Sequence, residues 1–135
     1  MRTKRFLLTC GVLFLVAIAW NAFVHLVVLR AANASVEHLR RPDLAEKVWL
    51  SLLLTAGIVT VFVWGYSRFA RNGSLREGLG YGLFFALVAG LLVDLNQYVL
   101  FPIPAVVAGQ WFLGGLVEFS LYGLIATRLY PPRGR

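Results

Sequence analysis

The chain has 135 residues, and 59% of them are hydrophobic even before its 13 glycines are counted, whereas an average soluble domain is roughly 45–50% apolar with glycine included. This composition excludes a disordered tail, a collagen-like fibre and an ordinary soluble enzyme. Only 14% of the residues are charged, yet 13 Lys and Arg against 6 Asp and Glu give a net charge of +7, which in a soluble protein would suggest a nucleic-acid partner.

Four apolar stretches are long enough to cross a membrane. A bilayer core about 30 Å thick requires about 20 consecutive apolar residues in a helix, because lipid offers no hydrogen-bond partner to a free backbone group. The stretches that qualify are 6–29, 48–67, 79–101 and 105–127. We therefore expect an all-α, integral membrane four-helix bundle, with residues 1–135 forming a single transmembrane domain.

The first stretch has an alternative interpretation as a cleaved signal peptide. A basic segment, Met1 to Arg5, precedes it, and Ala17-Ile18-Ala19 has the small-x-small form of a cleavage site. The apolar run continues past Ala19 to Leu29, so the pattern favours a membrane span.

The charges in the connections predict an orientation. With four spans, the N-terminus, the second loop and the C-terminus lie on one side, and short cytoplasmic loops carry an excess of Lys and Arg. That side holds nine cations, and the other side holds Arg30, Arg40, Arg41 and Lys47, diluted by three acids. We therefore expect both termini on the cytoplasmic side (N-in/C-in) of a bacterial inner membrane.

The nine cations are Arg2, Lys4, Arg5, Arg68, Arg71, Arg76, Arg128, Arg133 and Arg135. They are placed to contact anionic lipid headgroups, and we expect no nucleic-acid partner.

The connections carry recognisable stop and start signals. In the first loop a short interfacial helix is expected at 32–39, and Leu44 to Lys47 leads into the second span. Asn72-Gly73 predicts a helix stop, and the segment from Ser74 to Glu77 forms a capping box that starts the third helix. The short segment Pro102-Ile103-Pro104 predicts that helices three and four form a tight antiparallel hairpin.

Small residues recur at four-residue spacing on the third helix. Such spacing lets a second membrane helix approach closely, so this face is expected to meet protein and to carry Asp94 into the bundle. The expected packing residues are Gly82, Ala86 and Gly90, with Gly114 on the fourth helix. Gly78 and Gly80 are also interpreted as packing glycines, because no strand precedes them as a nucleotide-binding loop would require.

Polar residues inside the spans form the candidate site. At about 1.5 Å of rise per residue, most lie roughly 6 to 12 Å below the outer helix ends, and Glu118 lies about 20 Å below. The candidates are Asn21, His25, Asp94, Gln97, Tyr98, Gln110, Trp111 and Glu118. Ionisable residues in spans often mark ion or proton pathways. The alternative is a structural layer in which His25 pairs with Asp94 and the amides hydrogen-bond across helices.

The sequence offers little for metal or covalent chemistry. Two histidines and one cysteine predict no metal or haem site. Ser51, Thr55 and Thr60 are expected to hydrogen-bond to helix carbonyls, and Ser120 has no histidine at its depth. We therefore expect no catalytic residues and no cofactor.

The layout resembles that of small bacterial four-helix membrane proteins of unknown function. The resemblance rests on Asn21 and His25, the Asn72–Glu77 helix start with Gly78 and Gly82, and Pro102 to Pro104 followed by Trp111 and Glu118. It implies the fold and no substrate. We expect a non-enzymatic multi-pass membrane protein that acts by binding, as an accessory subunit of a larger membrane complex or a small homo-oligomer. The alternative is a small proton-linked transporter or channel.

Overall fold

The computed structural model describes residues 2–132, and within this range the chain is helical, with no strand. The α-helices are α1 (Thr3–Phe23), α2 (Arg30–Ser35), α3 (Val48–Phe69), α4 (Leu75–Ala89), α5 (Leu95–Leu100) and α6 (Ala105–Leu129). Two π-helical segments, η1 (Val24–Val28) and η4 (Gly90–Asp94), continue α1 and α4, and two 3₁₀ segments, η2 (Glu37–Leu39) and η3 (Leu44–Lys47), lie in the first loop.

Four continuous helical stretches are long and apolar enough to cross a membrane. They run Thr3–Val28, Leu44–Phe69, Leu75–Leu100 and Ala105–Leu129, and each coincides with one expected span. The first three begin a few residues before the apolar run, because the helices extend into the flanking polar residues. The all-α prediction with four candidate spans is confirmed.

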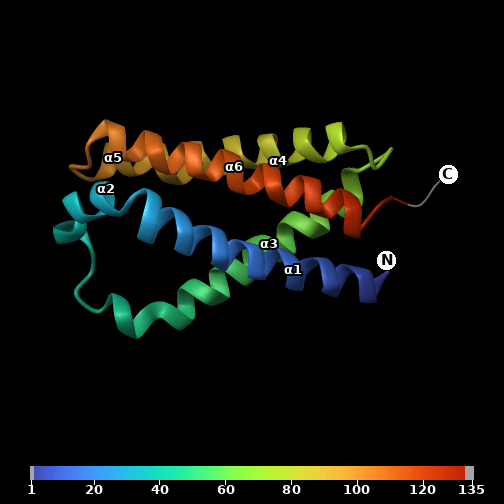
Figure 1. Ribbon diagram of the computed structural model, residues 1–135, viewed down its shortest axis with the longest axis horizontal. Coiled ribbons are helices and arrows are strands. Elements are labelled where there is room, and N and C mark those ends of the chain that lie inside the picture. The colour runs from blue at the N-terminus through green and yellow to red at the C-terminus, as the bar shows by residue number, and fades with distance from the viewer. Residues whose placement is uncertain (1, 133–135) are drawn as a thin grey trace.

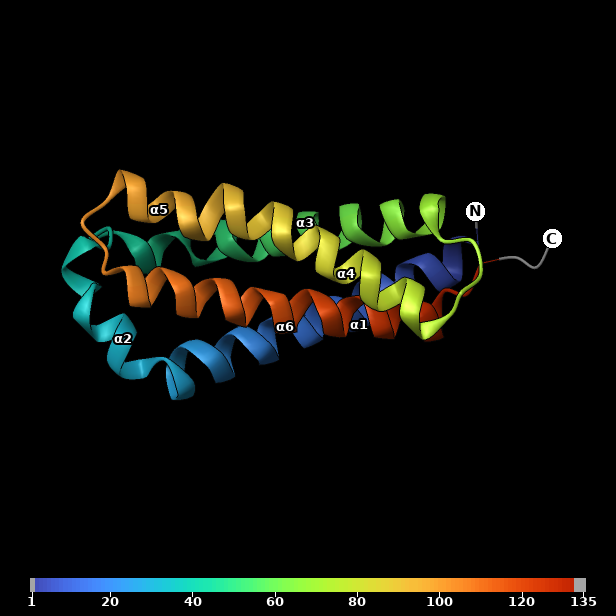
Figure 2. The same ribbon diagram turned by 90° about the horizontal axis from the view of Figure 1, so that it is seen from above.

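The bundle has two distinct ends. The start of α1, the end of α3, the start of α4 and the end of α6 lie together at one end, which we call the basic end (Figures 1 and 2). There the backbone N–H of Arg2 donates to the hydroxyl of Tyr130 at 3.4 Å, and the Arg2 guanidinium lies over the Tyr130 ring. At the opposite end, which we call the loop end, lie α2 and α5.

The half of the bundle toward the basic end is an aromatic core. Phe62 on α3 is completely buried, and its ring meets those of Tyr81 and Tyr122 edge-on at centroid distances of 4.9 and 5.7 Å. Tyr66 donates a hydrogen bond to Thr127 at 3.1 Å within this core. Such aromatic pairs stabilise beyond their buried area, so this half holds α3, α4 and α6 in register.

Close contact between α4 and α6 depends on residues that lack a side chain. A Cβ at Gly78 would overlap the carbonyl of Gly123, and a Cβ at Gly82 would overlap that of Phe119. A Cβ at Gly90 of η4 would overlap the side-chain ring of Phe112, whereas one at Gly114 would only touch Val24 of η1 at 3.5 Å. Ala86 is buried in the same interface. Gly80 has open space around it and lies on the outward face of α4, so it does not pack against another helix among residues 2–132.

Helix α3 packs against the bundle along only half of its length. Its buried residues are Val59, Phe62, Val63, Gly65 and Tyr66, all toward the basic end. From Val48 to Ile58 its side chains are exposed or half-buried. Figure 1 shows the corresponding divergence of α3 from α1 toward the loop end. The bundle is therefore tightly packed at the basic end and open between its helices at the loop end.

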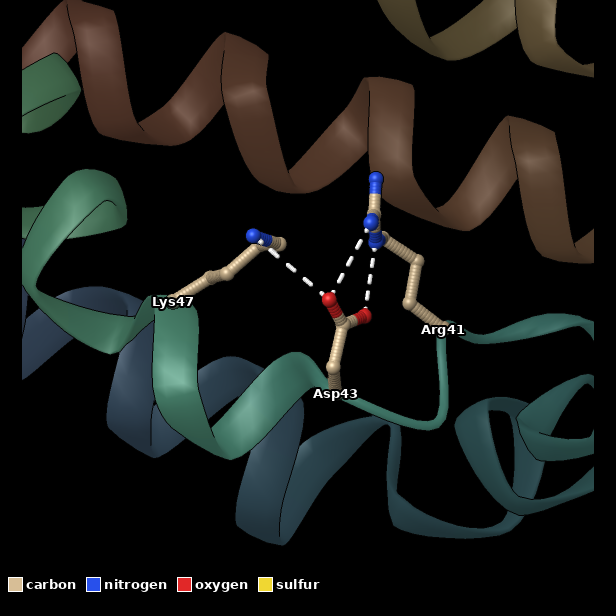
Figure 3. A network of polar contacts seen from close by, with 3 residues as sticks. All are labelled: Arg41, Asp43 and Lys47. Atoms are coloured by element: carbon tan, nitrogen blue, oxygen red, sulfur yellow. Dashed lines mark hydrogen bonds and ion pairs between the residues drawn. The ribbon is translucent and has the colours of Figure 1, made fainter.

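The first loop covers part of the loop end. Val36 is buried with Ile103 and Val107, and Trp111 packs against this cluster. Farther along, Asp43 bridges Arg41 and Lys47, with Nε of Arg41 at 2.9 Å and Nζ of Lys47 at 3.5 Å from its carboxylate (Figure 3). The Arg41 guanidinium lowers the pKa of the Asp43 carboxyl. The expected helix at 32–39 appears as α2 followed by η2.

The second loop follows the predicted stop and start. Gly73 has a φ of +64°, a conformation that glycine adopts without strain. Ser74 is the N-cap of α4, and its hydroxyl accepts from the Glu77 N–H at 3.2 Å. The Glu77 carboxylate accepts hydrogen bonds from the backbone N–H groups of Arg71, Asn72 and Gly73. Glu77 therefore stabilises the second loop as well as the first turn of α4.

Candidate functional site

A cavity of about 410 Å³ lies between the four long helices in the loop-end half of the bundle. Its wall on the α3 side is the half of α3 that does not pack against the core. The lining residues are Trp20, Asn21, Val24, His25, Ser51, Leu54, Thr55, Ile58, Ala89, Val93, Asp94, Trp111, Gly114, Gly115, Glu118, Phe119 and Tyr122. Five of the eight predicted site residues are thereby brought to one cavity: Asn21, His25, Asp94, Trp111 and Glu118.

Glu118 is held in a defined orientation. Its Oε1 accepts hydrogen bonds from the Asn21 side-chain amide at 2.8 Å and from the Tyr122 hydroxyl. The same Asn21 amide donates to the Ala17 carbonyl at 2.9 Å. Depth along the helices would separate Asn21 from Glu118, but α1 is inclined to α6 (Figure 2), and the two side chains meet in a hydrogen bond. Two donors thus fix one carboxylate oxygen, and Oε2 has no hydrogen bond with any of residues 2–132.

Asp94 reaches the cavity from the end of η4 without a partner in the described chain. Its Oδ2 lies beside Gly115 of α6, 3.7 Å from the position that a Cβ would occupy there. Among residues 2–132 its carboxylate makes no hydrogen bond and no ion pair. The His25–Asp94 pair of the alternative, structural interpretation is therefore not formed.

His25 instead belongs to a network that ties the first loop to α6. The side-chain nitrogen of Asn33 lies 3.0 Å from His25 Nδ1 and donates to the His25 carbonyl at 3.1 Å. The indole N–H of Trp111 donates to Asn33 Oδ1 at 2.9 Å. Asn33 is buried, with 6% of its surface exposed. Sequence reasoning missed this residue, and its one signal was a lone amide among Ala31, Ala32 and Ala34 just beyond the end of a span.

Both π-helical segments carry an ionisable residue that lines the cavity. His25 lies within η1, and Asp94 is the last residue of η4. A π-bulge adds one residue to a helical turn, turning the side chains that follow, and such bulges are frequent at functional sites. Apolar periodicity along a span does not reveal them.

Three predicted site residues lie away from this cavity. Gln97 lines a separate cavity of about 120 Å³ near the loop end, together with Arg40 and Trp111. Tyr98 is 53% exposed on the outside of the bundle. Gln110 is absent from both linings, and its buried Oε1 has no hydrogen-bond partner among the described residues.

The cavity offers groups that can bind a ligand. The hydroxyl of Thr55 donates to the Ser51 carbonyl at 2.9 Å and that of Thr60 donates to the Ala56 carbonyl, as the sequence predicted. The hydroxyl of Ser51, for which the same was expected, makes no hydrogen bond with residues 2–132, and that of Ser120 donates to the Leu116 carbonyl. Within residues 2–132 no three His, Cys, Asp or Glu side chains are grouped to hold a metal ion. What remains is two carboxylates, an imidazole and an amide among aromatic rings.

Comparison with protein-family models, with curated proteins and with solved structures gives no match for this chain. Its function is therefore inferred from the geometry of the cavity.

Proposed function

We propose that this is a non-enzymatic four-span membrane protein that acts by binding, and that the cavity between its helices holds the bound molecule. The observation that carries the proposal is a cavity of about 410 Å³ whose lining includes Asn21, Asp94 and Glu118. Ligand sites of about 300–1,000 Å³ are commonly apolar with a few convergent polar groups. A purely structural polar layer would be packed, with its polar groups paired, whereas Asp94 has no partner among residues 2–132.

The proposal includes a location and an orientation. We place the chain in a bacterial inner membrane with the basic end in the cytoplasm, and α4, α5 and α6 as an antiparallel hairpin that turns at the outer face. Support comes from the cations that flank the helices at the basic end, since such residues are retained in the cytoplasm. A reporter active only in the cytoplasm should be active after Pro132 and inactive when inserted after His38. The reverse pattern would contradict the orientation.

We further propose that the protein works as an accessory subunit or as a small homo-oligomer. Short loops leave little polar surface, so contact with other proteins would occur along the helices. Gly11 on α1 and Gly57 on α3 are exposed with no neighbour within 4 Å, and small residues on membrane-facing surfaces permit helix association. The molar mass of the purified protein in nanodiscs, corrected for lipid, should exceed that of one chain. A single chain without co-purified protein would contradict this part.

Water access to the cavity tests the binding proposal. In a Cys10→Ser background, Thr55→Cys places a thiol in the lining, and Leu53→Cys places one on the exposed membrane face. Methanethiosulfonates react with the thiolate, which needs an aqueous environment. The neutral 2-hydroxyethyl reagent should label the cysteine at 55 and leave the one at 53 unmodified. Failure to label position 55 in the folded protein would mean a closed, dry cavity and would refute the binding site.

Proton-linked transport is the second candidate, and the unpartnered carboxylate of Asp94 favours it. Such a group can gain or lose a proton without breaking a hydrogen bond within the described chain, and the path would continue through Glu118 and His25. Proteoliposomes that enclose a pH-sensitive dye should show solute-dependent proton movement that Asp94→Asn abolishes. Equal movement with both proteins would exclude Asp94 as the proton carrier.

A further inference from the structure

We infer that the cavity binds a small organic cation, held between Asp94 and Glu118. The inference rests on the proposed function and adds the class of ligand. It combines three features of the cavity: its charge, its aromatic lining and the difference between its two carboxylates.

The charge of the lining is unbalanced. Two acids line the cavity, neither Lys nor Arg is among the lining residues, and Nδ1 of the lining His25 faces the side-chain nitrogen of Asn33. Within the described range the ion pairs are those of Asp43 at the loop end. Asp94 and Glu118 are half-buried, and an ionised carboxylate that loses part of its hydration is stabilised by a counter-charge. A cation that enters the cavity supplies this counter-charge, whereas an anion would add to the repulsion.

The rings around the cavity favour an organic cation over a metal ion. Trp20, Trp111, Phe119 and Tyr122 contribute to the lining, and aromatic faces attract ammonium groups, including quaternary ones. Divalent metal ions require several grouped ligands, and the described residues contain no such group of three. The cavity is also far larger than a bare ion. The lining of the cavity therefore suits an ammonium group that carries alkyl substituents.

The two carboxylates differ in a way that suggests separate roles. Oε1 of Glu118 is held by Asn21 and Tyr122, so this acid is oriented before a ligand arrives. Asp94 lies beside the backbone of Gly115 with no hydrogen bond to another described residue. Asp94 would then be the free counter-charge and Glu118 the fixed acceptor. Loss of Asp94 should weaken binding and leave the fold intact.

Charge selection can be measured with choline and 3,3-dimethylbutan-1-ol, which differ by the replacement of N⁺ with carbon. Isothermal titration of the protein in nanodiscs, with tetramethylammonium and ethylammonium as further cations, should show binding of at least one cation and none of the neutral alcohol. Asp94→Asn should weaken that binding by about tenfold or more. Glu46→Gln removes an exposed acid outside the cavity and should change nothing.

The outcomes separate the class of ligand from the function itself. Equal binding of choline and the alcohol, no binding of any of the three cations, or an equal loss in Glu46→Gln would each overturn the inference. If the cysteine at 55 is labelled while no cation binds, the cavity remains a binding site and only the ligand class is wrong. If the cysteine at 55 is not labelled, the proposed function fails as well.

A charge series of thiol reagents gives a second measurement. In the Thr55→Cys protein, the trimethylammonium-ethyl methanethiosulfonate should react faster than the sulfonatoethyl reagent. Each rate is divided by the rate of the same reagent at Ser35→Cys, an exposed position at the end of α2, which removes the intrinsic difference between the reagents. We expect the corrected rate of the trimethylammonium reagent to exceed that of the sulfonatoethyl reagent, and the ratio of the two corrected rates to fall in Asp94→Asn. A ratio of one or below would contradict cation selection.

Discussion

Asn21 on α1 donates a hydrogen bond of 2.8 Å to the carboxylate of Glu118 on α6, joining two helices that lie 97 residues apart at these positions. The bond explains how an acid with no cation nearby is accommodated in a span. The polar groups of the cavity therefore fall into two sets. The structural set, which includes Asn21 and Glu118, is hydrogen-bonded between helices, and Asp94 has no partner among residues 2–132.

Asn21→Leu should lower the stability of the bundle. The change keeps the approximate volume but removes a donor from the Glu118 carboxylate, and the loss of one such bond costs about 1–3 kcal/mol. Thermal unfolding in detergent measures the effect. Asn96→Leu is the control, because Asn96 is exposed on α5 and makes no side-chain hydrogen bond with the described residues. An equal shift in both variants would contradict a structural role for Asn21.

Asp94→Asn should leave thermal stability nearly unchanged. No hydrogen bond or ion pair within residues 2–132 depends on this carboxylate, so its neutral isostere removes no stabilising contact there. The substitution should instead weaken the binding of a cation. A drop in unfolding temperature as large as that of Asn21→Leu would show that Asp94 belongs to the structural set.

Gly78→Ala should destabilise the bundle strongly, and Gly80→Ala should not. The two glycines lie two residues apart on α4, yet a Cβ at Gly78 would overlap the backbone of Gly123 and one at Gly80 would meet nothing within 4 Å. Overpacking costs about 1–3 kcal/mol, whereas Ala in place of Gly on an open helix face favours the helix by up to about 1 kcal/mol. Comparison of the two unfolding temperatures tests this. Similar behaviour would mean that α4 and α6 do not make the close contact described.

Asn33→Ala should release the first loop from the loop end of the bundle. The change removes the bonds to His25 and to the Trp111 indole. Hydrogen exchange of residues 30–39 should accelerate, and Trp111 should become more accessible to a fluorescence quencher. His38→Ala alters an exposed residue of the same loop and should leave exchange unchanged. Unaltered exchange in Asn33→Ala would show that the apolar cluster around Val36 is sufficient to hold the loop.

Local sequence signals predicted the helices well, for identifiable reasons. Uninterrupted apolar runs of membrane length predict spans directly, because the length follows from the bilayer. The Ser74 cap and the Asn72-Gly73 stop were predictable because capping depends on residues within one helical turn. Packing glycines were less predictable. Gly78 and Gly80 look alike in sequence, and only the position of α6 distinguishes the buried residue from the exposed one.

The residue types of the candidate site were predictable, and the hydrogen-bond partners of these residues were much less so. Polar residues in spans identified Asn21, His25, Asp94 and Glu118, because each such residue is costly in lipid and needs a reason to be there. Their partners could not be derived from depth. His25 bonds to Asn33 rather than to Asp94, since η1 and the following helix α2 bring that amide back to the ring nitrogen Nδ1.

Composition and charge pattern by themselves determined that this is a helical chain with four candidate spans, because hydropathy and span length are local properties of the sequence. The tertiary structure decided which polar groups meet. The inclination of α1 to α6, the divergence of α3 from the core and the two π-helical turns together open a cavity and place two acids in it, with only Glu118 hydrogen-bonded to a described residue. These features arise from contacts between residues far apart in the chain, which no local pattern encodes.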